Sequence, residues 1–235
     1  MQHPNSVQDF YNSINDHYTE YIQRCVPRYA EMQWAILHYI PNDLKPKRIL
    51  DLGCGAGNLT DLIIEKYPDA EIHMVDISEE MINKCELKYK DNPKIRAHCM
   101  DFRKLKFEMG SFDLVLSSIS IHHINDEDKY ILFWNINHLL GPDGIFSYSD
   151  QFSGGNDEIY LKHIATWKEE TLKMGTTEVE WQMWMDHQDR HDYHTTLEKQ
   201  LGFFKKAGFQ QVDCVWRYLL WTVVIGIKKS LLPST

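Results

Sequence analysis

The 235-residue sequence has no apolar run long enough to cross a membrane, and it shows no secretory signal peptide or lipidation motif. Its five cysteines are scattered and odd in number, and no two of them form a C-x-x-C pair, so no disulfide framework is predicted. Basic residues are in deficit, with 25 Lys and Arg against 34 Asp and Glu, a formal net charge of −9. Phosphate binding needs a basic surface, so a nucleic-acid partner is not expected. These absences predict a cytoplasmic protein that has no membrane partner. They do not decide whether the protein forms a homodimer.

Three glycines at alternate positions, Gly53, Gly55 and Gly57, follow a short apolar run that contains Asp51. Residues 58–67 then carry apolar side chains at helical spacing, so the pattern predicts a strand, a glycine turn and a helix. A nucleotide-like ligand binds at such a turn, where the backbone must approach it closely. The third glycine comes one residue too early for a dinucleotide fingerprint, and no Gly-Lys-Ser/Thr follows. An acid beside the turn would repel a pyrophosphate and attract an ammonium group.

Acids stand at the ends of the next two strand-like runs. Asp76 follows the run 71–75, about 20 residues beyond the glycine turn, where a carboxylate can accept hydrogen bonds from a ribose diol. Asp101 and Phe102 follow the run 94–100, where an acid can accept from an adenine amino group while the aromatic ring covers the base.

These motifs occur in a recognisable order. Leu-Asp-Leu-Gly-Cys-Gly-Ala-Gly at residues 50–57 is followed by the two acids, by Ser-Ile-Ser-Ile-His-His at 118–123 after a fourth strand, and by a turn at 139–144 before a fifth. The order resembles the class I S-adenosylmethionine-dependent methyltransferase family, in its small-molecule branch, over residues 47–150. The resemblance implies an α/β fold: a Rossmann-like seven-stranded, mostly parallel sheet with a terminal antiparallel hairpin and a helical cap insertion. It also implies S-adenosylmethionine as the cofactor.

The resemblance assigns roles around that cofactor. The glycines would approach it by backbone, Asp51 would lie towards its amino-acid end, and the two serines after the fourth strand would lie near the sulfonium. Tyr18 either closes over the cofactor from a mobile helix or simply packs that helix onto the sheet. The expected cofactor-binding residues are Tyr18, Asp51, Gly53, Gly55, Gly57, Asp76, Ile77, Met81, Asp101, Phe102, Ser117 and Ser118.

Four segments are expected along the chain. Residues 1–46 form an N-terminal helical lid, and residues 47–150 form the cofactor-binding core. Residues 151–194 lack a strand signal and are interpreted as a helical substrate cap, since long insertions in compact domains are usually functional. Residues 195–235 supply the final helix and the terminal hairpin, and a capping box at Thr195–Glu198 is expected to open that helix.

Candidate catalytic residues are His122 and His123, which lie just past the fourth strand, where a methyl group would be presented. Histidine titrates near neutrality, so one of them is a candidate base, while a structural histidine bonded to backbone is the alternative.

The end of the expected cap, residues 186–194, holds three histidines and three aspartates. On a helix, His187 and His191 would share a face with His194 one turn further on, and imidazoles with carboxylates suit Zn, Fe, Ni or Mn. A hydrated connector, or recognition of an anionic substrate with Arg190, explains the same residues. The expected substrate-binding residues are Tyr11, Asp150, Trp184, Arg190, His191 and His194.

Methyl transfer to a small-molecule acceptor is the predicted function. One alternative is a carboxy-S-adenosylmethionine synthase of tRNA modification, which needs a cation such as Arg24, Arg28 or Arg190 to hold the extra carboxylate. The other is a non-catalytic S-adenosylmethionine-binding domain, which degraded cofactor motifs would favour, whereas these motifs are intact.

Overall fold

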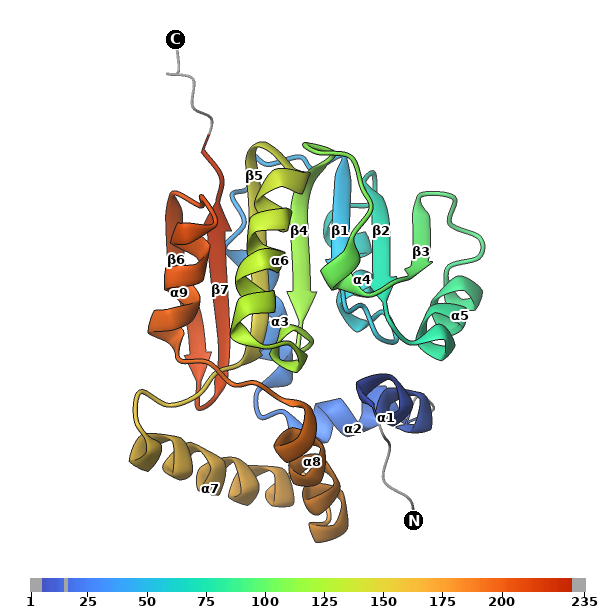
Figure 1. Ribbon diagram of the computed structural model, residues 1–235. Coiled ribbons are helices and arrows are strands. Elements are labelled where there is room, and N and C mark those ends of the chain that lie inside the picture. Colours follow the sequence, from blue (N-terminus) through green and yellow to red (C-terminus); the bar gives the residue numbers. More distant parts are fainter. Residues whose placement is uncertain (1–5, 15–16, 230–235) are drawn as a thin grey trace.

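The computed structural model describes residues 6–14 and 17–229; the outermost residues of the expected terminal segments, 1–5 and 230–235, and residues 15–16 lie outside it. Seven strands form one sheet in the order β3-β2-β1-β4-β5-β7-β6 (Figure 1). β1 to β5 are parallel, whereas β7 runs antiparallel to both β5 and β6. The predicted fold is confirmed. The strands are β1 Arg48–Leu52, β2 Glu71–Asp76, β3 Ile95–Cys99, β4 Phe112–Ser118, β5 Leu140–Gln151, β6 Gln211–Tyr218 and β7 Trp221–Ile227.

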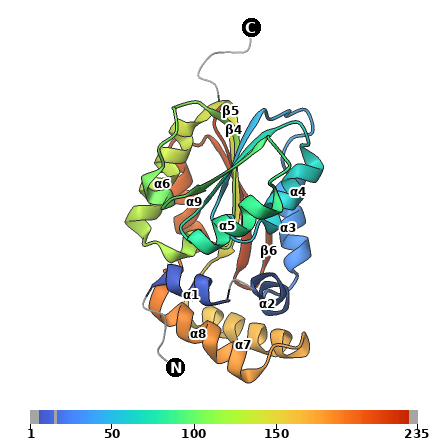
Figure 2. The ribbon, with the colours of Figure 1, turned by 90° about the vertical axis from the view of Figure 1, so that its right-hand side faces the viewer.

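Helices cover both faces of the sheet (Figure 2). One apolar core joins α3, α4 and α5 to the sheet, and a second joins α6 and α9 to its other face. The central strands are apolar on both sides because both faces are covered. The helices are α1 Val7–Ile14, α2 Tyr18–Cys25, α3 Tyr29–His38, α4 Asn58–Lys66, α5 Glu79–Lys88, α6 Asp126–Leu139, α7 Asp157–Lys173, α8 Glu178–His191 and α9 Leu197–Lys206, with single 3-10 turns η1 Phe102–Lys104 and η2 Ile121–His123.

The N-cap predicted for the final helix, α9, is wrong by one residue. Thr196, not Thr195, is the N-cap of α9, and its hydroxyl accepts from the Lys199 amide. Thr195 instead bonds Asp126 and the Lys129 ammonium. A complete capping box does occur, at Thr177 and Glu180, where it opens α8.

The helices α1, α2, α7 and α8 lie together beyond the carboxyl ends of the parallel strands (Figure 1). Direct contacts join the two pairs: the Trp167 indole donates to the Cys25 carbonyl, and Arg24 pairs with Glu180 at 2.8 Å. The Phe10 ring stacks on His187 with centroids 3.9 Å apart. Both segments that flank the core therefore meet over the sheet edge where ligands bind in this architecture. Within the described residues, no helix combines the length and apolarity that a membrane span requires.

Candidate active site

The glycine turn between β1 and α4 needs glycine for conformation and for space. Gly53, Gly55 and Gly57 have φ of 66°, 51° and 81°, in the left-handed region that glycine adopts without strain. A Cβ on Gly53 would lie 2.3 Å from the Ser120 hydroxyl. A Cβ on Gly57 would lie 2.5 Å from the Tyr89 hydroxyl, so this third glycine serves packing and the start of α4.

A cavity with about 730 Å³ of open space lies against this turn, and we name it the glycine-turn cavity. Its walls come from the ends of the strands and from α1 and α2, which cover it. The lining residues are Val7, Tyr11, Tyr18, Gly53, Gly55, Asp76, Ile77, Met81, Asp101, Phe102, Arg103, Ile119, Ser120, His123 and Ile124. Most of the expected cofactor-binding residues therefore lie at one cavity, whereas Asp51, Gly57, Ser117 and Ser118 do not line it.

Asp76 lies at the end of β2 and braces the turn. Its carboxylate accepts from the amides of Gly55, at 2.8 Å, and Ser78, at 2.9 Å, and burial raises its pKa. The Ile77 amide also bonds this carboxylate, whose two oxygens can together accept about four hydrogen bonds, so a ligand hydroxyl can still bind. Asp101, at the neighbouring strand end, pairs with Arg103 at 2.6 Å; burial opposes ionisation there, but Arg103 holds the Asp101 pKa below its usual value.

Asp51 does not line the glycine-turn cavity, and its expected contact with the cofactor's amino-acid end stays a prediction. It is 1% exposed, and one of its oxygens accepts from the Thr60 hydroxyl at 2.5 Å. The other oxygen has no partner among the described residues. Burial raises its pKa to about 7.

The two serines predicted near the sulfonium, Ser117 and Ser118, also do not line the glycine-turn cavity. The Ser117 hydroxyl donates to the Leu52 carbonyl, and the Ser118 hydroxyl accepts from Gln33. The chain then turns at Ile119, whose φ of 54° is unusual for a β-branched residue, and this turn brings Ser120 to the cavity wall. Ser120 stands in the same motif as the predicted serines, but local periodicity does not reveal the turn.

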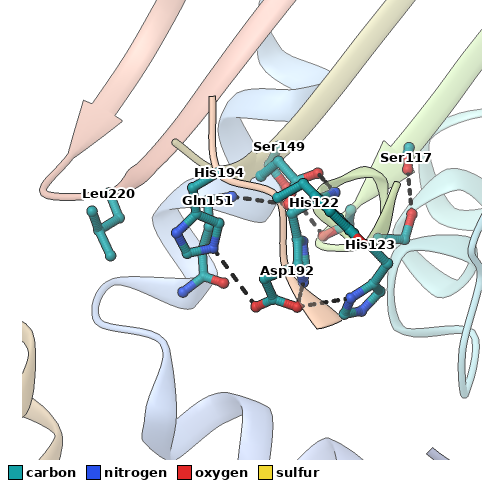
Figure 3. Close-up of polar contacts among 12 residues, drawn as sticks. Ser117, His122, His123, Ser149, Gln151, Asp192, His194 and Leu220 are labelled. Atoms are coloured by element: carbon teal, nitrogen blue, oxygen red, sulfur yellow. Dashed lines mark hydrogen bonds and ion pairs between the residues drawn. The ribbon is translucent and has the colours of Figure 1, made fainter. Parts of the chain in front are cut away.

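The two histidines of η2 have different surroundings (Figure 3). His122 is 3% exposed, and both its backbone amide and its Nδ1 bond the Asp150 carboxylate. Burial disfavours the charged ring, but Asp150 and Asp192 raise the pKa of His122 above its usual value. Asp150 therefore bonds His122 and lines neither cavity, and its substrate role stays a prediction.

His123 faces the glycine-turn cavity and links it to Asp192. Its Nδ1 lies 2.9 Å from an Asp192 oxygen, and its Nε2 lies 3.0 Å from the Tyr11 hydroxyl. Burial, reinforced by His122, lowers the pKa of His123, which favours the neutral ring. A carboxylate only accepts, so Nδ1 carries the proton and Nε2 accepts from Tyr11.

A second, much smaller cavity lies between the N-terminal helices and the segment 151–194, and we name it the tryptophan cavity. Tyr11 and Ile119 line both cavities. The full lining is Tyr11, Ile22, Cys25, Ile119, His122, Gln151, Trp167, Trp184, His187, Gln188, Asp192 and Trp221.

The other predicted substrate and metal residues are dispersed. Trp184 and His187 line the tryptophan cavity, and burial together with His123 lowers the pKa of His187 to about 3. Arg190 is exposed, and His191 lines neither cavity. His194 lies at a separate surface hollow, where its Nδ1 is 2.6 Å from the Tyr160 hydroxyl. Asp192, which no sequence signal singled out, is the residue that faces four of the histidines.

The doubly wound sheet, the glycine turn after β1, the acids after β2 and β3 and the covered cavity together form the fold of class I S-adenosylmethionine-dependent methyltransferases. Residues 49–144 match the family described as Methyltransferase domain. The residues present fit S-adenosylmethionine: two glycines leave space for close approach, carboxylates stand at the ends of β2 and β3, and Phe102 lines the same wall.

Three relatives show the extent of the similarity. The malonyl-[acyl-carrier protein] O-methyltransferase of Bacillus cereus is 30% identical over 129 residues, which is 52% of this chain but only 46% of that protein. The carboxy-S-adenosyl-L-methionine synthase of Helicobacter pylori is 22% identical over 222 residues, 90% of each chain. Among solved structures, the Haemonchus contortus phosphoethanolamine N-methyltransferase 2 superposes with a TM-score of 0.70 at 17% identity, covering 96% of this chain and 60% of that one. The chain thus spans about half the length of the first of these relatives.

Proposed function

We propose that this protein transfers the methyl group of S-adenosylmethionine to a small molecule held in the tryptophan cavity. The observation that carries the proposal is that the two cavities share Tyr11 and Ile119. A methyl donor in one cavity and an acceptor in the other would meet at this shared wall. Holding the two reactants in line supplies most of the catalysis that such a displacement needs.

The cofactor supplies an electrophilic methyl group on a positively charged sulfur. On the protein side, Asp76 would bind the ribose, Asp101 and Phe102 the adenine, and Ile77 and Met81 the apolar edge between them. Gly53 and Gly55 would contact the amino-acid portion by backbone, with Tyr18 as the aromatic cover. Ser120 takes the place first assigned to Ser117 and Ser118.

Tyr11 is the group best placed to act on the acceptor. Its hydroxyl lies at the wall between the cavities and donates to the His123 Nε2, which leaves its oxygen lone pairs free to accept a hydrogen bond from the acceptor's N–H or O–H. A proton lost by the acceptor would pass to Tyr11 while the phenol proton passes to His123. His123 is thus a positioning residue and proton acceptor behind Tyr11, and His122 supports it from the Asp150 side.

The flanking segments would act as covers. We assign residues 6–14 and 17–46 as the described part of a lid and residues 151–194 as a substrate cap, because both segments line the tryptophan cavity. Excluding water there would protect the reacting groups. The net charge of −9 supports a free small molecule over a nucleic acid as acceptor, and a cytoplasmic setting is consistent with five unpaired cysteines.

Synthesis of carboxy-S-adenosylmethionine is the second candidate, because the synthase relative spans 90% of this chain. The geometry supports it less. Among the described residues that line the two cavities, Arg103 is the one Arg or Lys, and Asp101 already binds it. Arg24 pairs with Glu180, Arg28 lies over the Tyr218 ring and Arg190 is exposed.

Mass spectrometry of the nucleoside that co-purifies with the protein separates the candidates. Both candidates bind S-adenosylmethionine; S-adenosylhomocysteine, which methyl transfer leaves behind, supports the transferase, and a carboxylated derivative supports the synthase. A preparation that neither carries nor binds any of the three by calorimetry would refute both and leave a non-catalytic domain.

A further inference from the structure

Asp192 lies at the centre of a histidine cluster that the proposed transfer reaction uses only in part. It follows α8 directly, and its side chain is 4% exposed. Four imidazoles surround its carboxylate: His122 and His123 from η2, His187 from α8, and His194 from the connection to α9 (Figure 3 shows all but His187).

Hydrogen bonding accounts for one of these four contacts. His123 Nδ1 lies 2.9 Å from Asp192, whereas His122 Nε2 lies at 3.7 Å, His187 Nε2 at 3.8 Å and His194 Nε2 at 3.6 Å. Those three distances exceed a hydrogen bond. Two donor atoms bound to one tetrahedral metal ion at 2.0–2.1 Å lie roughly 3.4 Å apart, so each distance from a histidine nitrogen to the Asp192 oxygen is within about half an ångström of that value.

The far nitrogens of three rings are already engaged. Asp150 binds His122 Nδ1, the Tyr11 hydroxyl contacts His123 Nε2, and the Tyr160 hydroxyl contacts His194 Nδ1. In metal sites, a ligating histidine typically uses its second nitrogen in this way, which fixes the orientation of the ring. Here each of the three rings is held with its other nitrogen towards Asp192.

Two of the facing nitrogens have no hydrogen-bond partner among the described residues. These are His187 Nε2 and His194 Nε2, on side chains that are 4% and 7% exposed, and His187 Nδ1 is also unpartnered. Buried polar atoms are rarely left without a partner, and each such case needs an explanation. A ligand that accepts nitrogen lone pairs would provide one.

We infer that this cluster binds a divalent first-row transition-metal ion through Asp192, His122 Nε2 and His123 Nδ1, and that small shifts of the His187 and His194 rings, which lie outside this converging group, complete its coordination. The first three donor atoms all lie within 4.8 Å of one another. A set of imidazoles with a single carboxylate favours Zn²⁺, Fe²⁺, Co²⁺ or Ni²⁺ over the oxygen-seeking Mg²⁺ and Ca²⁺. The possible metal ligands predicted from sequence spacing are His187, His191 and His194. The inferred ligands include Asp192 and do not include His191.

A bound ion would also control Tyr11, a consequence that rests on the proposed function. Coordination at His123 Nδ1 leaves the ring proton on Nε2, which then donates to the Tyr11 hydroxyl. The proposed proton transfer needs the opposite tautomer, so the loaded site would suppress base-assisted transfer. Metal binding itself does not depend on that reaction.

Calorimetric titration with Zn²⁺ tests the inference on the full chain, purified without an affinity tag and stripped with a chelator, with no cofactor or acceptor present. We expect one equivalent to bind. Asp192→Asn and His187→Gln should each weaken binding by about 100-fold, and Tyr160→Phe, which removes only the support of His194, by about 10-fold. Substituting Co²⁺ should give the visible absorption of a low-coordinate nitrogen and oxygen site, and Asp192→Asn should abolish it.

The matched control is His191→Gln, which changes a histidine on the same helix outside the cluster and should leave Zn²⁺ affinity within threefold. Circular dichroism and S-adenosylmethionine affinity show whether each variant is folded, and Tyr160→Phe, which keeps its ring, serves if a buried substitution unfolds the chain. Binding of less than a tenth of an equivalent by the unaltered protein overturns the inference. So does an equal loss of affinity in the His191 and His187 variants, because surface histidines would then hold the metal.

Discussion

Replacing Asp51 with asparagine should remove a pH dependence from the stability of the fold. Burial raises the pKa of Asp51 to about 7, and in the unfolded chain the pKa of an aspartate is about 3.9. Between these values the folded state binds more protons than the unfolded state. The free energy of unfolding therefore falls as pH rises from about 4 to about 7, and the contribution is complete only below that window.

The slope from one such group approaches about 1.4 kcal/mol per pH unit at the centre of the window. Asparagine is uncharged throughout, and its amide oxygen accepts the Thr60 hydroxyl as the carboxylate does. Denaturation in urea, followed by tryptophan fluorescence at pH 4, 5, 6 and 7, measures the difference between the two proteins. Relative to the unaltered chain, Asp51→Asn should gain stability by about 1 kcal/mol for each unit of rising pH.

The control is Asp69→Asn, which removes the same charge from a fully exposed side chain whose Lys94 partner is also at the surface. It should follow the unaltered protein across the window. Parallel curves for Asp51→Asn and the unaltered protein would show that the buried carboxyl group does not take up a proton, and the argument from desolvation would be refuted.

Three further substitutions test the proposed roles. Asp76→Ala removes the acceptor for a ribose diol and for two backbone amides, so calorimetry should show at least about tenfold weaker S-adenosylmethionine binding, with some loss of thermal stability; unchanged affinity would remove the ribose assignment. Tyr11→Phe, assayed in metal-free protein, should lower kcat by roughly 10- to 100-fold while the KM of the acceptor stays within about twofold; a rise in KM alone would make Tyr11 a binding residue. Trp184→Ala should raise the KM of the acceptor about tenfold without changing cofactor affinity, since no residue of α8 lines the glycine-turn cavity; weaker cofactor binding would contradict the separation of the two sites.

The sheet and the glycine-turn cavity were predictable because their signals are local. Each parallel strand ends in a motif whose residues are neighbours in sequence, and parallel strands place those ends at one edge. The prediction loses accuracy where the chain changes direction without a local signal. Positive φ at Ile119 is an example, because a β-branched residue gives no warning of it, and the wall residue becomes Ser120.

The Asp192 cluster illustrates a different limit. Helical spacing correctly joined His187 and His191 in one helix, but it carried no information on where the chain goes after α8. The Tyr193 amide donates to the His122 carbonyl at 2.7 Å, and this bond brings Asp192 against η2, 69 residues away from His123 in sequence. A contact between residues so far apart in sequence depends on how the whole core folds. It produces no periodic pattern in the sequence from which it could be predicted.

The bonds that join α1 and α2 to α7 and α8 also bear on the order of events in a catalytic cycle. The Trp167 indole, the Arg24–Glu180 pair and the stacked Phe10 and His187 rings fasten the two covers to each other. A displacement of one cover that breaks none of these contacts carries the other with it, so the donor and acceptor of the proposed reaction would share a single gate. Turnover would then depend on how often that gate opens, and exchange of the spent cofactor would be timed with departure of the methylated product.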